Sequence, residues 1–178
     1  MTGFSRSPGR NLFAGLMLAM LALPAVPAMA GPDESAFLQS YIGGWKGTGE
    51  LVGGAEKEDF TCRVNVTKGK DEKINYAGRC AVAGLNLSVA GTIAYIDANR
   101  RYEAAMTSNA TFSGTAIGRK QGKAVVFDLK ESDTDEQGNN MTISSQISLE
   151  GDNMALKFNI VFNDTGDQSN ASVTFARL

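Results

Sequence analysis

Three groups of residues in this chain have types and spacings that could carry chemistry: the cysteines Cys62 and Cys80, the tripeptide Asp164-Thr165-Gly166, and an acidic run that begins at Asp133. The tripeptide is that of aspartic peptidases, and the acidic run has part of the spacing of a calcium-binding loop. We expect both to be hairpin turns. Only twelve residues follow Gly166, and the calcium spacing lacks its Asp or Asn at the fifth position and its Glu at the twelfth.

The chain contains no histidine, and this absence restricts its chemistry further. Ser-His and Cys-His catalysis, imidazole-based zinc sites and haem held by a proximal histidine are excluded. We therefore expect a protein that is not an enzyme and that has no metal site and no cofactor.

The N-terminal segment, residues 1–30, has the organisation of a secretory signal peptide. Arg6 and Arg10 precede an uncharged apolar run, and Ala28-Met29-Ala30 supplies small residues for cleavage. The apolar run is too short to cross a bilayer, which needs about 20 residues. Cleavage after Ala30 would leave residues 31–178 as one domain, exported to the periplasm or secreted.

The charge of the exported domain disfavours some partners. Without Arg6 and Arg10 the domain has 15 of the 17 basic residues against 19 acidic ones, a net charge of −4. Clustered basic residues are the usual mark of nucleic-acid binding, and the domain has none longer than a pair. We expect no nucleic-acid partner, no integral membrane segment after cleavage, and a monomer.

Alternation of apolar and polar residues predicts an all-β fold. A short helix is expected over Gly31–Ser40, ending at Gly43-Gly44, and from Trp45 onward the hydrophobic period is two. The clearest strand segments are 60–67, 74–82, 85–95, 141–149, 154–162 and 171–175, with 102–106, 112–117 and 125–129 less regular. Turns rich in Gly, Asn and Asp separate them. This pattern predicts an antiparallel up-and-down barrel of about 8–10 strands.

The cysteines provide an independent test of one hairpin. If 60–67 and 74–82 pair around Asp71, Cys62 stands directly opposite Cys80, on the same face as the apolar residues. Export to an oxidising compartment makes a disulfide between them the expected state.

Large apolar residues of the predicted strands should point into the barrel. We expect them either to fill the core or to line a cavity that binds a small apolar ligand. The candidate ligand-binding residues are Trp45, Tyr76, Leu87, Tyr95, Tyr102, Met106, Phe112, Phe127, Met141 and Phe158.

The start and the end of the domain resemble those of calycin-type barrels. Gly43-Gly44-Trp45 after a short helix is similar to the Gly-x-Trp motif of lipocalins and related ligand-binding barrels. The resemblance implies that Arg177, near the last strand, packs over Trp45 and closes the barrel, where a guanidinium over an indole is favourable. It implies a bacterial lipocalin-like barrel with a lumenal ligand.

Two other functions stay open. An envelope protein-binding module, such as an inhibitor of a lysozyme or a secreted protease, could use residues 33–41 as an inserting segment. An outer-membrane barrel would instead place apolar residues outside and polar residues inside.

Overall fold

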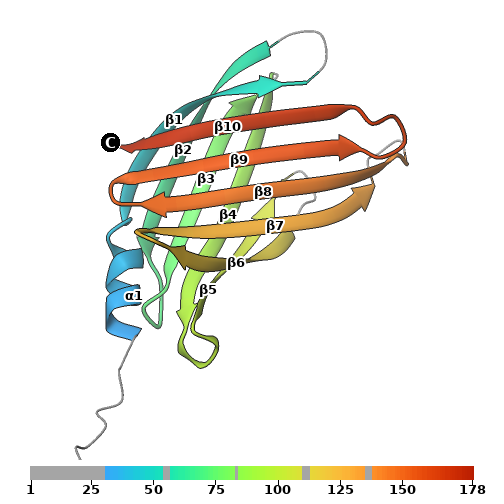
Figure 1. The fold of residues 1–178 in the computed structure, drawn as a ribbon. Coiled ribbons are helices and arrows are strands. Elements are labelled where there is room, and N and C mark those ends of the chain that lie inside the picture. Colours follow the sequence, from blue (N-terminus) through green and yellow to red (C-terminus); the bar gives the residue numbers. More distant parts are fainter. Residues whose placement is uncertain (1–30, 54–56, 83, 110–112, 135–137) are drawn as a thin grey trace, which may run out of the picture.

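The computed structural model describes residues 31–53, 57–82, 84–109, 113–134 and 138–178. The predicted signal peptide, residues 1–30, and the candidate ligand residue Phe112 lie outside the described residues. Figure 1 shows one short helix beside a β-barrel.

Within the described residues, ten strands follow the helix. The helix is α1 (Gly31–Gln39), and the strands are β1 (Gly43–Val52), β2 (Lys57–Lys68), β3 (Ile74–Val82), β4 (Leu85–Ile96), β5 (Arg101–Ser108), β6 (Ser113–Gln121), β7 (Ala124–Thr134), β8 (Asn140–Glu150), β9 (Asn153–Phe162) and β10 (Gln168–Arg177). A 3₁₀ turn, η1 (Asp97–Asn99), joins β4 to β5.

Every strand is antiparallel to its neighbour in sequence, and β10 pairs with β1 to close the barrel. The predicted all-β, up-and-down barrel is confirmed, with ten strands. Because β1 pairs with both β2 and β10, neither the first nor the last strand is left as a sheet edge.

The helix ends earlier than the glycines predict. It stops at Gln39, and the backbone N–H groups of Tyr41 and Ile42 then bond to the carbonyls of Leu38 and Gln39, three residues back. This tighter turn brings the chain to Gly43, whose φ of 139° suits glycine and begins β1.

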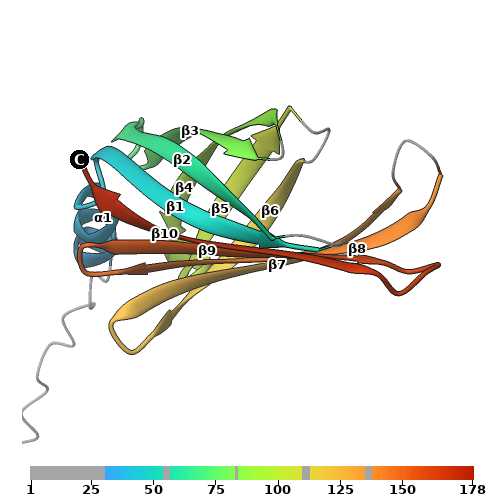
Figure 2. The same ribbon diagram turned by 90° about the horizontal axis from the view of Figure 1, so that it is seen from above.

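The two ends of the barrel differ. The helix end carries α1 and the four hairpins β2–β3, β4–β5, β6–β7 and β8–β9, and the opposite end, here called the open end, carries the other connections (Figure 1). At the open end β7 to β10 extend beyond the rest of the barrel, and the far ends of β7 and β8 curve away from β9 and β10 (Figure 2).

The barrel wall divides between β6 and β7 towards the open end. These strands pair only from Gln121–Ala124 to Ile117–Asp128, whereas β7 and β8 pair along ten positions, from Val125–Leu149 to Thr134–Asn140. Because β6 stays paired with β5 as far as Ser113, the two sheets separate at this seam. Near the helix the inner faces of β6 and β7 therefore belong to one continuous sheet, and towards the open end they do not.

Several inward-facing aromatic rings lie over a glycine on the adjacent strand. Tyr76 faces Gly91 and Phe127 faces Gly118 in the strand register. A Cβ on Gly91 would lie 2.5 Å from the Tyr76 hydroxyl, and one on Gly118 would lie 2.4 Å from the Phe127 ring. Rings that cover glycines in this way lie along the barrel wall, where they restore the apolar contact that the glycine lacks.

Candidate functional site

The lumen at the helix end is filled by a hydrophobic core. Trp45, Tyr102 and Phe127, three of the candidate ligand residues, are buried in it at 0%, 3% and 1% exposure. The rings of Tyr102 and Phe127 pack edge to face with their centroids 6.3 Å apart. These side chains form the floor of the lumen, where Tyr102 also contacts Phe37 of the helix and Trp45 stacks on Tyr41.

Tyr76 and Tyr95 pack against this core and are only partly buried. Tyr95 lies edge to face with Tyr102, at 5.0 Å between centroids. The Tyr76 hydroxyl donates to the Ala105 carbonyl at 3.4 Å, and burial raises the pKa of Tyr76 to about 12. Tyr95 lies at the helix end of β4, whereas Tyr76 covers Gly91, which is also the register partner of Met106.

The remaining candidate ligand residues in the described chain lie towards the open end. Leu87, Met106, Met141 and Phe158 belong to the inward-facing rows of β4, β5, β8 and β9 and are each half-buried. They are outside the core cluster and outside the side chains that pack on it. The structure thus separates the described candidates into a buried floor, two tyrosines that pack on it, and a half-buried apolar wall.

Further inward-facing residues continue this wall. Ile160 on β9 is half-buried and Ile143 on β8 is buried at 4% exposure, while the half-buried Leu51 on β1 and Leu129 on β7 pack against the core. Apolar and aromatic side chains are the main lining of sites that bind apolar ligands.

Helix α1 closes the other end of the barrel. Leu38 and Tyr41 are buried at 0% and 1% exposure, and the ring of Phe37 contacts that of Tyr102 at 6.1 Å between centroids. The Gln39 side-chain amide also donates to the Glu72 carboxylate in the β2–β3 hairpin. In this structure residues 33–41 therefore cover the barrel floor.

The first and last strands meet at Trp45 and Arg177. The two residues are directly opposite in the β1–β10 register, and the guanidinium carbon of Arg177 lies 4.5 Å from the indole centroid. Trp45 Nε1 donates to the Tyr41 carbonyl at 2.9 Å, and Arg177 Nη1 donates to the Ile42 carbonyl at 2.8 Å. This geometry joins the barrel closure to the segment that follows the helix.

The disulfide joins β2 to β3 within the same wall. Cys62 and Cys80 are register partners and are bonded, with Cα atoms 4.0 Å apart. Cys62 is fully buried and Cys80 is half-buried. The predicted hairpin register and the predicted pairing are both confirmed.

Among strand positions that face the inside of the barrel, here called the inward-facing rows, basic residues lie at the helix end and acidic residues lie at the open end. Lys68, Lys120 and Arg177 occupy such positions at the helix end. Glu58, Glu131 and Asp133 occupy them at the open end. The remaining charged residues of the ten strands occupy outward positions.

Glu131 lies at the seam between β6 and β7. A Cβ on Gly114 of β6 would lie 2.7 Å from Glu131 Oε1, so the carboxylate extends over this glycine. Gly114 is the register partner of Met106 on β5. Sequence reasoning missed Glu131. It follows Phe127 and Leu129 at intervals of two residues, so the alternation could have predicted that it faces inward.

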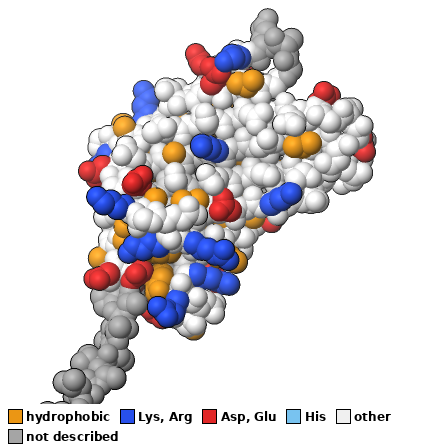
Figure 3. Space-filling view, in the orientation of Figure 1, with side chains coloured by type: hydrophobic (Ala, Val, Ile, Leu, Met, Phe, Trp, Pro, Cys, Tyr) orange, Lys and Arg blue, Asp and Glu red, His pale blue; other side chains and the backbone are white. Residues whose placement is uncertain are grey.

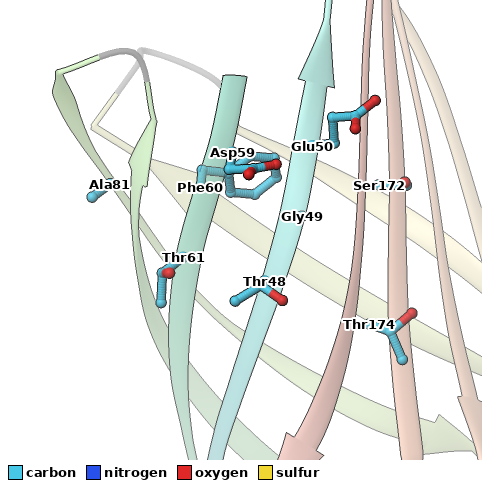
Figure 4. A pocket seen from close by; sticks show the side chains of 9 residues that line it. All are labelled: Thr48, Gly49, Glu50, Asp59, Phe60, Thr61, Ala81, Ser172 and Thr174. Carbon is cyan, nitrogen blue, oxygen red and sulfur yellow. The ribbon is translucent and has the colours of Figure 1, made fainter. Parts of the chain in front are cut away.

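Two shallow grooves cross the strands on the outside of the barrel. One is lined by residues of β3, β2, β1 and β10, among them Thr48, Glu50, Asp59 and Thr174, which Figure 4 shows on adjacent strands. The other runs from β1 across β10, β9 and β8 to β7, between side chains such as Asp128 and Lys157. In Figure 3, charged side chains are spread singly over the upper part of this face, and several Lys and Arg side chains gather at its lower left.

The motifs considered for catalysis and metal binding form no site in the described residues. Asp164-Thr165-Gly166 is part of the β9–β10 turn, where the Gly166 N–H donates to the Phe162 carbonyl at 2.7 Å. Part of the acidic run after Asp133, residues 135–137, lies outside the described residues. Among the described residues no three Cys, Asp or Glu side chains are grouped to hold a metal ion, and no helix is long and apolar enough to span a membrane.

Comparison with known proteins identifies the fold and no family. No protein-family model and no curated protein sequence matches this chain. The crystal structure of Rv2717c from M. tuberculosis superposes with a TM-score of 0.60 at 12% identity, covering 80% of this chain and 97% of that one. The S-type phycobiliprotein lyase CPES from Guillardia theta superposes with a TM-score of 0.56 at 11% identity, covering 84% and 94%. At these identities the likeness shows that the chain has a calycin-like barrel fold.

Proposed function

We propose that this protein is an exported, non-enzymatic barrel that binds a small apolar ligand in the open end of its lumen. The observation that carries the proposal is the change in burial along the inward-facing rows. Trp45 and Phe127 are buried at the helix end, whereas Met106 and Phe158 are only partly buried on the same inner surface. Fully burying a large apolar side chain contributes about 1.5–3 kcal/mol, so a ligand that covers the exposed part of these side chains gains a fraction of that free energy for each.

The proposal of a non-enzymatic role rests on the residues. The chain has no histidine, and the inward-facing carboxylates stand at the rim of an apolar wall. One structure with this fold belongs to a protein named a lyase, so the fold alone does not argue against catalysis. Export rests on the signal-peptide pattern of residues 1–30. N-terminal sequencing of the protein from the periplasm or the medium should give Gly31 as the first residue.

Ligand binding is tested by titrating residues 31–178 with a fluorescent apolar probe and by extracting the native protein with organic solvent. Met106→Gln changes an inner side chain of β5, and Thr107→Gln changes the adjacent outer one. We expect the Met106 variant to bind the probe at least about tenfold more weakly, because an amide is costly to bury without partners. The Thr107 variant should bind like the wild type.

The outcome also decides between this function and protein binding. If no apolar probe binds and nothing is extracted, the lumenal site is absent and the protein-binding alternative becomes the better hypothesis. If the Met106 and Thr107 variants lose the same affinity, the probe binds outside the lumen and the proposal is wrong.

A further inference from the structure

We propose that the open end selects a cationic amphiphile, with Glu131 as the counter-ion of its positively charged head group. This inference rests on the proposed function, because it assigns a ligand class to the same lumenal site. It is carried by the sign of the inward-facing charges, by the position of Glu131 at the seam, and by its contact with Gly114.

The first argument is charge complementarity. An apolar chain inserted from the open end passes Glu58, Glu131 and Asp133, and the basic residues of the inward-facing rows lie at the other end, beside α1. A carboxylate or sulfate head would meet like charges at this entrance, while an ammonium or guanidinium head would meet opposite ones. Attraction of this kind acts more strongly beside an apolar wall than in bulk water.

The second argument is the position of Glu131 relative to the apolar wall. Gly114 separates Glu131 from Met106 in the inner rows, and it has no side chain to fill the space between them. On β8, the register partner of Glu131 is Ile143. A ligand whose apolar chain lies against Met106 would therefore have its head group within reach of the Glu131 carboxylate.

The third argument is that these carboxylates have no basic partner within the part of the chain that the structure describes. The ion pairs found there are Lys57–Glu50, Lys68–Glu72 and Arg101–Glu103, and none includes Glu131, Asp133 or Glu58. Glu131 is half-buried, so its charge is less well hydrated than that of a fully exposed residue. A bound cation would supply the missing partner.

The test compares three probes that share a decyl chain and differ in the head group: decyltrimethylammonium, decanoate and the neutral decyl maltoside. Binding is measured by calorimetric titration below the micelle concentration, at low ionic strength. We expect the cationic probe to bind about three- to tenfold more tightly than the neutral one, and decanoate more weakly than both. Added salt should reduce these differences while the neutral probe is unaffected.

Variants locate the charge. Glu131→Gln should lower affinity for the cationic probe about threefold and leave the neutral probe unchanged, and Glu131→Lys should favour decanoate. Asp128→Asn is the matched control, since Asp128 lies on the same strand but lines the outer groove. Asp133→Asn is the second variant if Glu131→Gln does not fold, as judged by the fluorescence of Trp45.

The outcomes separate this inference from the function beneath it. If the three probes bind equally, the lumen binds apolar chains and the charge selection is wrong. If none binds, the proposed function fails as well. If Asp128→Asn weakens the cationic probe and Glu131→Gln does not, the head group lies in the outer groove and the inference is overturned.

Discussion

The guanidinium of Arg177 lies over the indole of Trp45, with its carbon 4.5 Å from the ring centroid, and the two residues are register partners across the strands that close the barrel. The same guanidinium donates to the carbonyls of Ile42 and Ser40, in the segment between α1 and β1. The Arg177 side chain thus connects the last strand, the first strand and the end of the helix. Trp45 and Arg177 are 132 residues apart in the sequence.

Arg177→Lys should destabilise the protein by about 1–2 kcal/mol. A lysine keeps the charge but lacks the planar group that stacks on an indole. It also lacks the two separate nitrogens with which the guanidinium donates to both carbonyls. Urea unfolding followed by the emission of Trp45, the chain's single tryptophan, measures the change. Arg119→Lys, on an exposed outward position of β6, is the control and should unfold like the wild type. Equal midpoints for the two variants would show that the stacked geometry contributes no stability.

Reduction of the Cys62–Cys80 disulfide should lower the free energy of unfolding by about 3 kcal/mol, because the bond closes a loop in the unfolded chain. The comparison is between oxidised and reduced protein in denaturant titrations at the same pH. Cys62 is buried, so the reductant should act slowly on the folded protein and faster once it unfolds. An unchanged midpoint after complete reduction would contradict the prediction.

Gly91→Ala should destabilise the barrel by about 1–3 kcal/mol or more, as overpacking does. The new Cβ would lie 2.1 Å from the Ala105 carbonyl oxygen and 2.5 Å from the Tyr76 hydroxyl, so the backbone or the ring must move.

Gly44→Ala is the matched control for this substitution. A Cβ added at Gly44 would lie 3.3 Å from the side chain of Leu178, which is exposed and can adjust. Thermal unfolding measures both variants, and equal melting temperatures would show that the Tyr76 ring does not depend on Gly91.

Alkaline pH should unfold the protein as its buried tyrosines ionise. Burial raises the pKa of Tyr41, Tyr76 and Tyr102 to about 12, from about 10 in the unfolded chain. Nearby Asp152 and Glu150 add to the shift at Tyr41, and Arg177 opposes it.

The sign follows from proton linkage. Between about pH 10 and 12 the folded state binds more protons than the unfolded state, so stability is complete below pH 10 and falls as pH rises towards 12. Ultraviolet phenolate absorbance, recorded with the circular dichroism of the fold, measures this. Ionisation of these three tyrosines near pH 10 without loss of structure would contradict the prediction.

Local pattern was enough to predict most of the strands and one tertiary contact. The period-two alternation lies within single strands, and the turn at Asp71 sets the register of β2 and β3, so the Cys62–Cys80 pair could be located by counting residues. The Trp45–Arg177 contact came from a resemblance at the two ends of the domain.

What the alternation could not determine is which inward-facing residues are buried. Trp45 and Met106 have the same inward parity, yet the first belongs to the filled floor and the second to the half-buried wall. The difference depends on the position of α1 and on the separation of β6 from β7, both of which arise from contacts between segments distant in the chain. The placement of Glu131 beside Gly114 also arises from contacts between distant segments. The alternation predicts which face of β7 carries Glu131, but it does not predict which residue of β6 lies next to it.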